Sequence, residues 1–195
     1  PVRLSWSAAA DVSTNVARYE VQQSIDSSGF DGIGSTTGLS IVRQLNINHN
    51  YVFQVRAIDA VGNVGPWRVS STFHPYLYQT SGTVFTGTWS SQTATAYSGG
   101  STKYASVAGR YATFTATTAR AIAFVTTKAS SRGSFKVYVD GVYKTTISTY
   151  ATTSKYRQVV YQFNWTTPGT HKIKIYVVGT AGHPRVDVDA FVVLR

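Results

Sequence analysis

The sequence contains no cysteine and no methionine, and only eight of its 195 residues are Asp or Glu. Without cysteine, neither a disulfide nor a thiolate metal site can form. The absence of methionine predicts that the chain is part of a larger protein. Charged residues make up 13% of the chain, about half the usual share of roughly 25%. No stretch approaches the roughly 18 consecutive apolar residues of a membrane-spanning helix, so we expect no membrane span.

Serine, threonine, glycine and tyrosine take the place of charged residues, and 13 of the 195 residues are tyrosine. Thr, Tyr and Val fit the half-buried surface of a pleated sheet. The apolar fraction of 43% is enough for ordinary folded cores. The composition therefore predicts an all-β protein, with a length that suits two domains of about 100 residues each.

Charge divides the chain into two parts. Residues 1–75 hold five Arg and five acidic residues, whereas residues 76–195 hold 13 Lys and Arg and only three Asp. The whole net charge of +10 therefore belongs to the second part. This division predicts two modules, 1–75 and 76–195, with different roles. Their joint contains Pro75 and is not rich in Gly or Ser, which favours a short, stiff connection.

The first module alternates apolar and polar residues in short strands that turn clusters separate, as in a β-sandwich. Trp6, Tyr19, Leu45 placed six residues before Tyr51, and Ala57 before a Gly-rich loop resemble the fibronectin type III pattern over about residues 1–73. The resemblance implies an immunoglobulin-like sandwich with Trp6 and Tyr19 in its core. It also implies a core contact of Leu45 with Tyr51 and a corner at Tyr51 that ties the preceding loop. The module contains no Arg-Gly-Asp tripeptide, and we interpret it as a rigid spacer.

The second module shows about eight strands and no helix signal. Asp140-Gly141 between two alternating segments is a strong hairpin signal, and residues 167–170 predict a turn. An antiparallel sandwich of jelly-roll type fits this count. The expected strands are residues 84–89, 111–116, 119–126, 134–139, 142–147, 158–165, 171–177 and 185–194.

Several phrases of residues 80–195 resemble the galactose-binding-like jelly rolls, or carbohydrate-binding modules, of secreted bacterial glycoside hydrolases and polysaccharide lyases. These phrases specify turns and core, so they imply the fold more strongly than the ligand. The resemblance implies carbohydrate binding and an extracellular, secreted protein. The phrases are Gly87-Thr88-Trp89, Ser98-Gly99-Gly100, Gly109-Arg110, Val139-Asp140-Gly141, Pro168-Gly169-Thr170-His171 and Val188-Asp189-Ala190-Phe191.

Two surfaces of this module are candidates for binding a glycan, because aromatic faces and hydrogen-bond donors hold sugar rings. The first is a cleft between two loops, and loops on a rigid sandwich often carry function. The alternative for each of its residues is ordinary packing at the sandwich rim. The loop candidates are Tyr97, Lys103, Tyr104, Tyr150, Lys155, Tyr156, Arg157 and Trp165.

The second candidate surface is the outward face of two strands. Alternation places Lys136 and Tyr138 on one face, and Lys172, Lys174 and Tyr176 on one face of another strand. Adjoining strands would make a platform of basic and aromatic residues. The competing interpretation, which the sequence favours, is a solvated face whose lysines guard against edge pairing.

The cationic excess favours an anionic partner such as an acidic polysaccharide or a cell-surface glycan. Single-stranded nucleic acid also suits basic and aromatic surfaces, but an extracellular module makes it a poor candidate. A charge that serves only solubility remains the alternative.

Metal and catalytic signals are sparse. Asp187 and Asp189 lie two residues apart, and the resemblance implies one structural Ca²⁺ with Asp189 as a ligand. Glycoside hydrolysis normally needs two carboxylates, and this module has three Asp and no Glu. The four His lack zinc spacing, and no Gly-x-Ser-x-Gly elbow is present.

We therefore expect a fragment that is not an enzyme. The predicted function is polysaccharide binding beside other modules of a larger secreted protein that acts on polysaccharides or lies at the cell surface, with acidic glycans favoured. The alternative is a structural or adhesion spacer that binds protein or cell wall.

Overall fold

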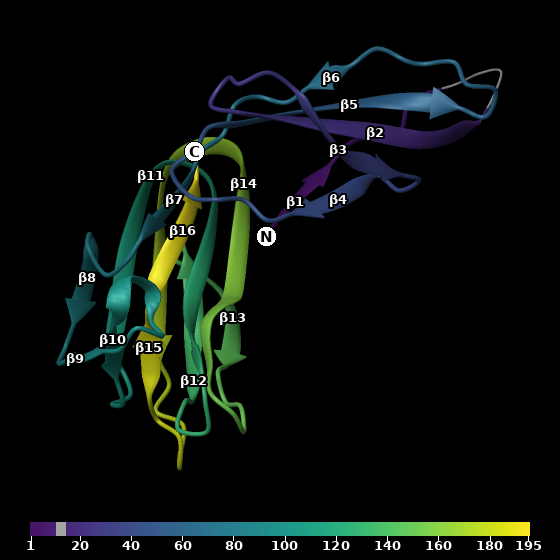
Figure 1. Ribbon diagram of the computed structural model, residues 1–195. Helices are drawn as coiled ribbons and strands as arrows, with labels where there is room; N and C mark the ends of the chain where they lie inside the picture. The colour runs from purple at the N-terminus through teal and green to yellow at the C-terminus, as the bar shows by residue number, and fades with distance from the viewer. Residues whose placement is uncertain (11–14) are drawn as a thin grey trace. The chain divides into compact units, whose positions relative to one another are not determined.

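A computed structural model describes residues 1–10 and 15–195 (Figure 1). The chain divides into two compact units, Pro1–Pro75 and Tyr76–Arg195, which we describe separately. In the described ranges, strands dominate and the single helical element is a 3-10 turn at Ser98–Gly100. The prediction of an all-β protein is confirmed.

The first unit consists of two antiparallel sheets. The smaller pairs β1 (Val2–Ser5) with β4 (Ser40–Arg43). The larger has the order β3-β2-β5-β6. Its strands are β2 (Val16–Ile25), β3 (Asp31–Thr36), β5 (Tyr51–Asp59) and β6 (Arg68–Val69).

Aromatic side chains form the core of this unit. Tyr19 and Tyr51 are buried as expected, whereas Trp6 is half-buried and packs 5.7 Å from the Tyr19 ring. The Tyr51 hydroxyl accepts a hydrogen bond from the Asn46 amide at 3.0 Å and donates one to the Asn46 carbonyl at 3.2 Å. The predicted corner at Tyr51 is therefore confirmed. Membership of the fibronectin type III family remains a prediction.

The second unit contains longer strands. They are β7 (Pro75–Tyr78), which begins at the boundary, β8 (Thr83–Thr86), β9 (Ser90–Thr93), β10 (Ser101–Ala105), β11 (Tyr111–Lys128), β12 (Ser134–Val139), β13 (Val142–Ser148), β14 (Lys155–Val177), β15 (Val186–Val188) and β16 (Ala190–Leu194). All their pairings with a known register are antiparallel. The hairpin at Asp140-Gly141 is confirmed, with both residues at positive φ (50° and 82°), as a type I′ turn requires.

Two long strands, β11 and β14, bend and supply both layers of a sandwich; Figure 1 shows β14 curving over one end of the unit. The segment 111–116 pairs with 171–176, and 121–126 pairs with 158–164. Register shifts at Ala119 mark the bend, and neighbouring Thr118 has φ 52°.

Two predictions are therefore wrong: the separate strands at 111–116 and 119–126, and the turn at 167–170. Pairing between Ala119 and Gly169 carries both strands through the bend, so neither chain has to leave the sheet.

The first layer has the strand order β8, β11, β14, β12, β13, and the second contains the other halves of β14 and β11 with β16 and β7. Phenylalanines fill the space between the layers. The rings of Phe114 and Phe191 stack at 4.7 Å, and Phe124 meets Phe135 edge-on at 5.3 Å. A third small sheet has the order β15-β10-β9. The predicted antiparallel sandwich is confirmed.

Candidate functional site

Strand alternation in the first layer of the second unit places tyrosines and lysines together on its outer face. In β12 and β14, the residues between them, such as Val137 and Ile175, are fully buried. We call this surface the tyrosine–lysine face. It consists of Tyr111, Lys136, Tyr138, Tyr143, Lys172, Lys174 and Tyr176.

Register brings these side chains next to one another. Lys136 lies opposite Tyr176, and Tyr138 opposite Lys174, between β12 and β14. Tyr111 lies opposite Tyr176 on the other side of β14. The two outward faces considered from the sequence therefore adjoin. Sequence reasoning missed Tyr111, although its alternation with Ala112 and Phe114 would have identified it.

Lys174 lies at the centre of this face, on the middle strand of the layer. Its ammonium is 4.4 Å from the centre of the Tyr138 ring and 5.4 Å from that of Tyr111. Cations in this position are attracted by the ring electrons, by about 0.5–1 kcal/mol at exposed sites. Two rings therefore hold one lysine in place.

Tyr143 is the most exposed tyrosine of the face, at 51%. It lies opposite Tyr138 in the β12–β13 hairpin, and the two rings meet edge-on at 5.7 Å. Its hydroxyl lies 3.0 Å from the Thr146 hydroxyl. Packing and hydrogen bonding thus fix an exposed ring, which sequence reasoning had not selected.

The face is strongly cationic. In the part of the chain that the structure describes, no carboxylate forms an ion pair with Lys136, Lys172 or Lys174. Asp140 lies in the turn at one end, but its carboxylate has other partners: it accepts hydrogen bonds from the Lys172 amide (2.8 Å), His171 Nδ1 (2.9 Å) and Trp165 Nε1 (3.1 Å). Partial burial raises the pKa of Asp140, but these hydrogen bonds together hold that pKa below its usual value.

The predicted loop cleft forms only in part. Arg157 donates to the carbonyls of Thr95 (2.7 Å) and Tyr97 (3.1 Å), so the two loops do meet. Tyr97, however, is 2% exposed and packs edge-on against Tyr156 at 5.5 Å. The prediction for Tyr97 as a ligand-stacking residue is therefore wrong, because its ring is already covered. Tyr156 remains 40% exposed beside exposed Lys155.

The other loop candidates lie apart from this contact. Tyr104 is half-buried on β10, and the Arg185 guanidinium covers its ring at 3.7 Å. Lys103 is half-buried beside it. Tyr150 is 47% exposed, with its ring 4.9 Å from His183.

Trp165 is half-buried, and its ring stacks on His171 at 4.0 Å. Because it also bonds to Asp140, it belongs to the turn at the end of the tyrosine–lysine face and not to the loop cleft.

The neighbourhood of Asp189 does not fit the predicted Ca²⁺. Calcium takes six to eight oxygen ligands. The two Asp189 oxygens accept hydrogen bonds from the Ser98 amide (2.8 Å) and hydroxyl (3.2 Å), while Arg132 and Arg185 occupy the Asp187 carboxylate. Across residues 1–10 and 15–195, no three His, Cys, Asp or Glu side chains cluster as metal ligands would. Burial raises the pKa of Asp189 more than the Ser98 hydrogen bonds lower it.

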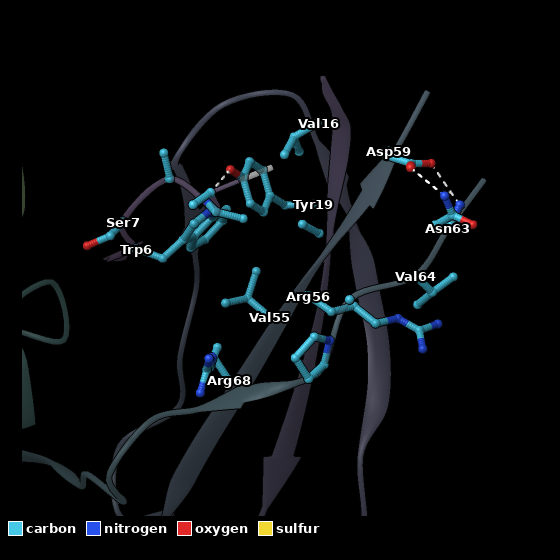
Figure 2. A pocket seen from close by; sticks show the side chains of 16 residues that line it. Trp6, Ser7, Val16, Tyr19, Val55, Arg56, Asp59, Asn63, Val64 and Arg68 are labelled. Atoms are coloured by element: carbon cyan, nitrogen blue, oxygen red, sulfur yellow. Dashed lines mark hydrogen bonds between the residues drawn. The ribbon is translucent and has the colours of Figure 1, made fainter. Parts of the chain in front are cut away.

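A cavity of about 630 Å³ opens in the first unit (Figure 2). Trp6, Tyr19 and Val55 contribute to its apolar wall. Its acidic residue, Asp59, accepts hydrogen bonds from the backbone and side-chain amides of Asn63, both at 2.7 Å. The carboxylate therefore closes a turn, and Asp59 is the single acidic side chain among the described residues that line the cavity.

None of the helical turns within the described residues is long and apolar enough to cross a membrane.

Comparison with known proteins gives similarities of fold. No protein-family model and no curated protein matches the chain. A Paenibacillus xanthan lyase structure is 11% identical, with a TM-score of 0.50, over 74% of this chain and 20% of that one. A family two carbohydrate esterase from Cellvibrio japonicus is 15% identical (TM-score 0.47, 63% of this chain, 33% of that one). A family 35 carbohydrate binding module from Clostridium thermocellum is 17% identical (TM-score 0.46, 61% of this chain, 98% of that one).

The chain thus spans a fifth to a third of the lyase and the esterase. At these identities the likeness concerns the fold alone, and the function has to be argued from the surface of this chain.

Proposed function

We propose that the second unit is a non-catalytic polysaccharide-binding module and that the tyrosine–lysine face is its binding surface. The observation that carries the proposal is the adjacency of exposed Tyr143, ring-held Lys174 and half-buried Tyr176 on one sheet face. Aromatic rings offer apolar faces to the C–H groups of sugars, and ammonium groups donate hydrogen bonds to their oxygens.

The other outer face of the sandwich provides an internal comparison. In the middle of β11, β14 and β16 the outward positions are uncharged: Ala121 lies opposite Asn164, and Ala123 lies between Gln162 and Val192. Lys128, Lys155 and Arg157 lie only at the ends of these strands. General solubility would not require tyrosines and lysines to gather on only one of the two faces. Their segregation therefore supports a binding role over the solvated-surface alternative.

The absence of counter-charges to these lysines among the described residues favours an acidic glycan. Lysines without carboxylate partners attract carboxylate and sulfate groups, and this attraction weakens as salt rises. Such polymers occur outside cells, which supports a secreted, accessory role with the first unit as a spacer.

The three Asp side chains of the second unit already have ion-pair or hydrogen-bond partners within the protein, which supports a role without catalysis. In the fully described second unit, Asp187 is bound by two arginines and Asp189 is buried under Ser98. Asp140 is held by three donors in a turn. No pair of free carboxylates is available for the acid and nucleophile or base of glycoside hydrolysis.

Three tyrosines with similar exposure allow a matched test: Tyr143 on the face (51%), Tyr150 in a loop (47%) and Tyr156 at the start of β14 (40%). Each is replaced by alanine in the full chain, and retardation is measured by affinity electrophoresis in polygalacturonate, dextran sulfate and neutral dextran. Loss of a stacking contact weakens binding by about 2- to 13-fold. We expect this loss for Tyr143→Ala and near wild-type retardation for Tyr150→Ala.

Each other outcome has a definite meaning. Loss with Tyr156→Ala but not with Tyr143→Ala would move the site to the loop contact. Wild-type protein that is not retarded by any polymer would reject the proposal and favour the structural-spacer alternative.

A further inference from the structure

We infer that Lys174 is the specificity-determining residue of the tyrosine–lysine face: its ammonium recognises the carboxylate or sulfate group of an acidic sugar. This inference rests on the proposed function and assigns the charge preference to one side chain.

The strand register isolates Lys174 at the centre of the face. Its direct neighbours across the sheet are Tyr138 on β12 and Thr113 on β11. Tyr111 lies diagonally, two residues along β11, and its ring is within reach of the ammonium at 5.4 Å.

The two rings make Lys174 a prepared binding group. A free lysine loses rotamer freedom when it binds an anion, and this loss weakens the binding. Lys174 is half-buried, and its ammonium is already confined near two ring centres. It has no carboxylate partner among the described residues, so an incoming anion replaces no protein ion pair.

Lys172 provides the comparison within the same strand and on the same face. It carries the same charge two residues away, but it is exposed and no aromatic ring lies against its ammonium in the described structure. If the attraction between a chain of net charge +10 and a polyanion were diffuse, the two lysines would contribute equally to binding. With a positioned contact, loss of Lys174 would weaken binding more than loss of Lys172.

Tyr143 links this contact to sugar stacking. The Tyr143 and Tyr138 rings are 5.7 Å apart, and the Lys174 ammonium lies 4.4 Å from the Tyr138 ring. The Tyr138 ring is therefore the one side chain between a sugar stacked on Tyr143 and the Lys174 ammonium. The face would then bind two features of its ligand: Tyr143 would contact the apolar face of a sugar ring, and Lys174 would bind an acid group beside that ring.

The test compares Lys174→Gln, Lys172→Gln and Lys174→Arg in the full chain. Dissociation constants come from affinity electrophoresis in polygalacturonate (carboxylates), dextran sulfate (sulfates) and neutral dextran, at low and high salt. We expect Lys174→Gln to weaken binding to at least one acidic polymer about tenfold, which is about 1.4 kcal/mol. Lys172→Gln, which removes an exposed lysine of the same face, should weaken binding clearly less than Lys174→Gln does, and Lys174→Arg should retain binding. The acidic polymer that responds identifies the acid group.

Two results would overturn the inference while leaving the proposed function in place. One is an equal, small effect of Lys174→Gln and Lys172→Gln, which would show that the attraction is diffuse. The other is an equal loss toward neutral and acidic polymers, which would make Lys174 a support for the rings. Failure of Tyr143→Ala to weaken any binding would instead reject the face itself.

Discussion

Replacement of Asp187 by alanine should be among the most destabilising single changes in the second unit. The Asp187 side chain is fully buried, and its two oxygens meet Arg132 Nε at 2.7 Å and Arg185 Nε at 2.6 Å. The two arginine side chains are only 11% and 17% exposed. Alanine would therefore leave two largely dehydrated cations side by side with no counter-charge.

The expected loss follows from this geometry. Breaking a buried ion pair by removal of one partner typically costs about 3–5 kcal/mol. Each kcal/mol lowers the melting temperature of a domain of this size by about 3–6 °C, so a decrease of about 9–30 °C is expected. The Tyr104 ring beneath Arg185 should lose its position as well.

Urea unfolding followed by circular dichroism would measure the free energy of unfolding. Asp140→Ala is the control, because that carboxylate is 41% exposed and also has two partners, the His171 imidazole and the Lys172 amide. It should cost only about 1–2 kcal/mol. If Asp187→Ala lowered the free energy of unfolding by less than about 1 kcal/mol, water would have to reach both guanidinium groups. That result would refute the view that Arg132, Asp187 and Arg185 form a buried ion-pair group.

Two further changes test the pKa shifts and one tests the first unit. The pKa of Asp189 is raised, so the folded state holds this proton more tightly than the unfolded state, and stability falls as pH rises from about 4 through the folded pKa. Asp189→Asn should remove that decrease in a series of thermal melts, and an unchanged pH slope would contradict it. The pKa of Asp140 is lowered, so its contribution is present above about pH 4 and is lost as pH falls through the folded pKa. Asp140→Asn should therefore reduce the loss of thermal stability at acidic pH, whereas Asp189→Asn should reduce the loss at higher pH. Tyr51→Phe should cost about 1–2 kcal/mol of unfolding free energy, because two hydrogen bonds to Asn46 are lost; a neutral result would show that water replaces them.

Much of the fold was predictable because it depends on local pattern. Alternation in residues 134–139 fixes which side chains are buried, and Asp140-Gly141 fixes the hairpin, since few residues adopt two consecutive positive φ angles. The bends in β11 and β14 were not predictable, because residues 116–119 and 167–170 look like strand ends. Pairing between Ala119 and Gly169, 50 positions apart, keeps them within the sheet.

The candidate site shows the same division. Strand alternation in the sequence identified Lys136, Tyr138 and Lys174 as outward residues, but the loops were the preferred prediction. The sequence did not show that the Tyr97 ring is covered by its contact with Tyr156. Exposure of a tyrosine depends on what packs against it, and a loop sequence does not contain that information. Tyr143 illustrates the opposite case, since its exposure follows from its place in the outermost strand of the layer.

The sequence by itself determined the class of structure, the charge difference between residues 1–75 and 76–195, and the alternation of faces in regular segments such as residues 134–139 and 171–177. These properties follow from composition and from the two-residue period of the β-strand. Only the tertiary structure decided that Lys174 lies between Tyr111 and Tyr138 and that Asp187 lies between two arginines. Both arrangements depend on register between strands that are distant in the sequence, and the burial of the whole sandwich, not any local signal, sets that register.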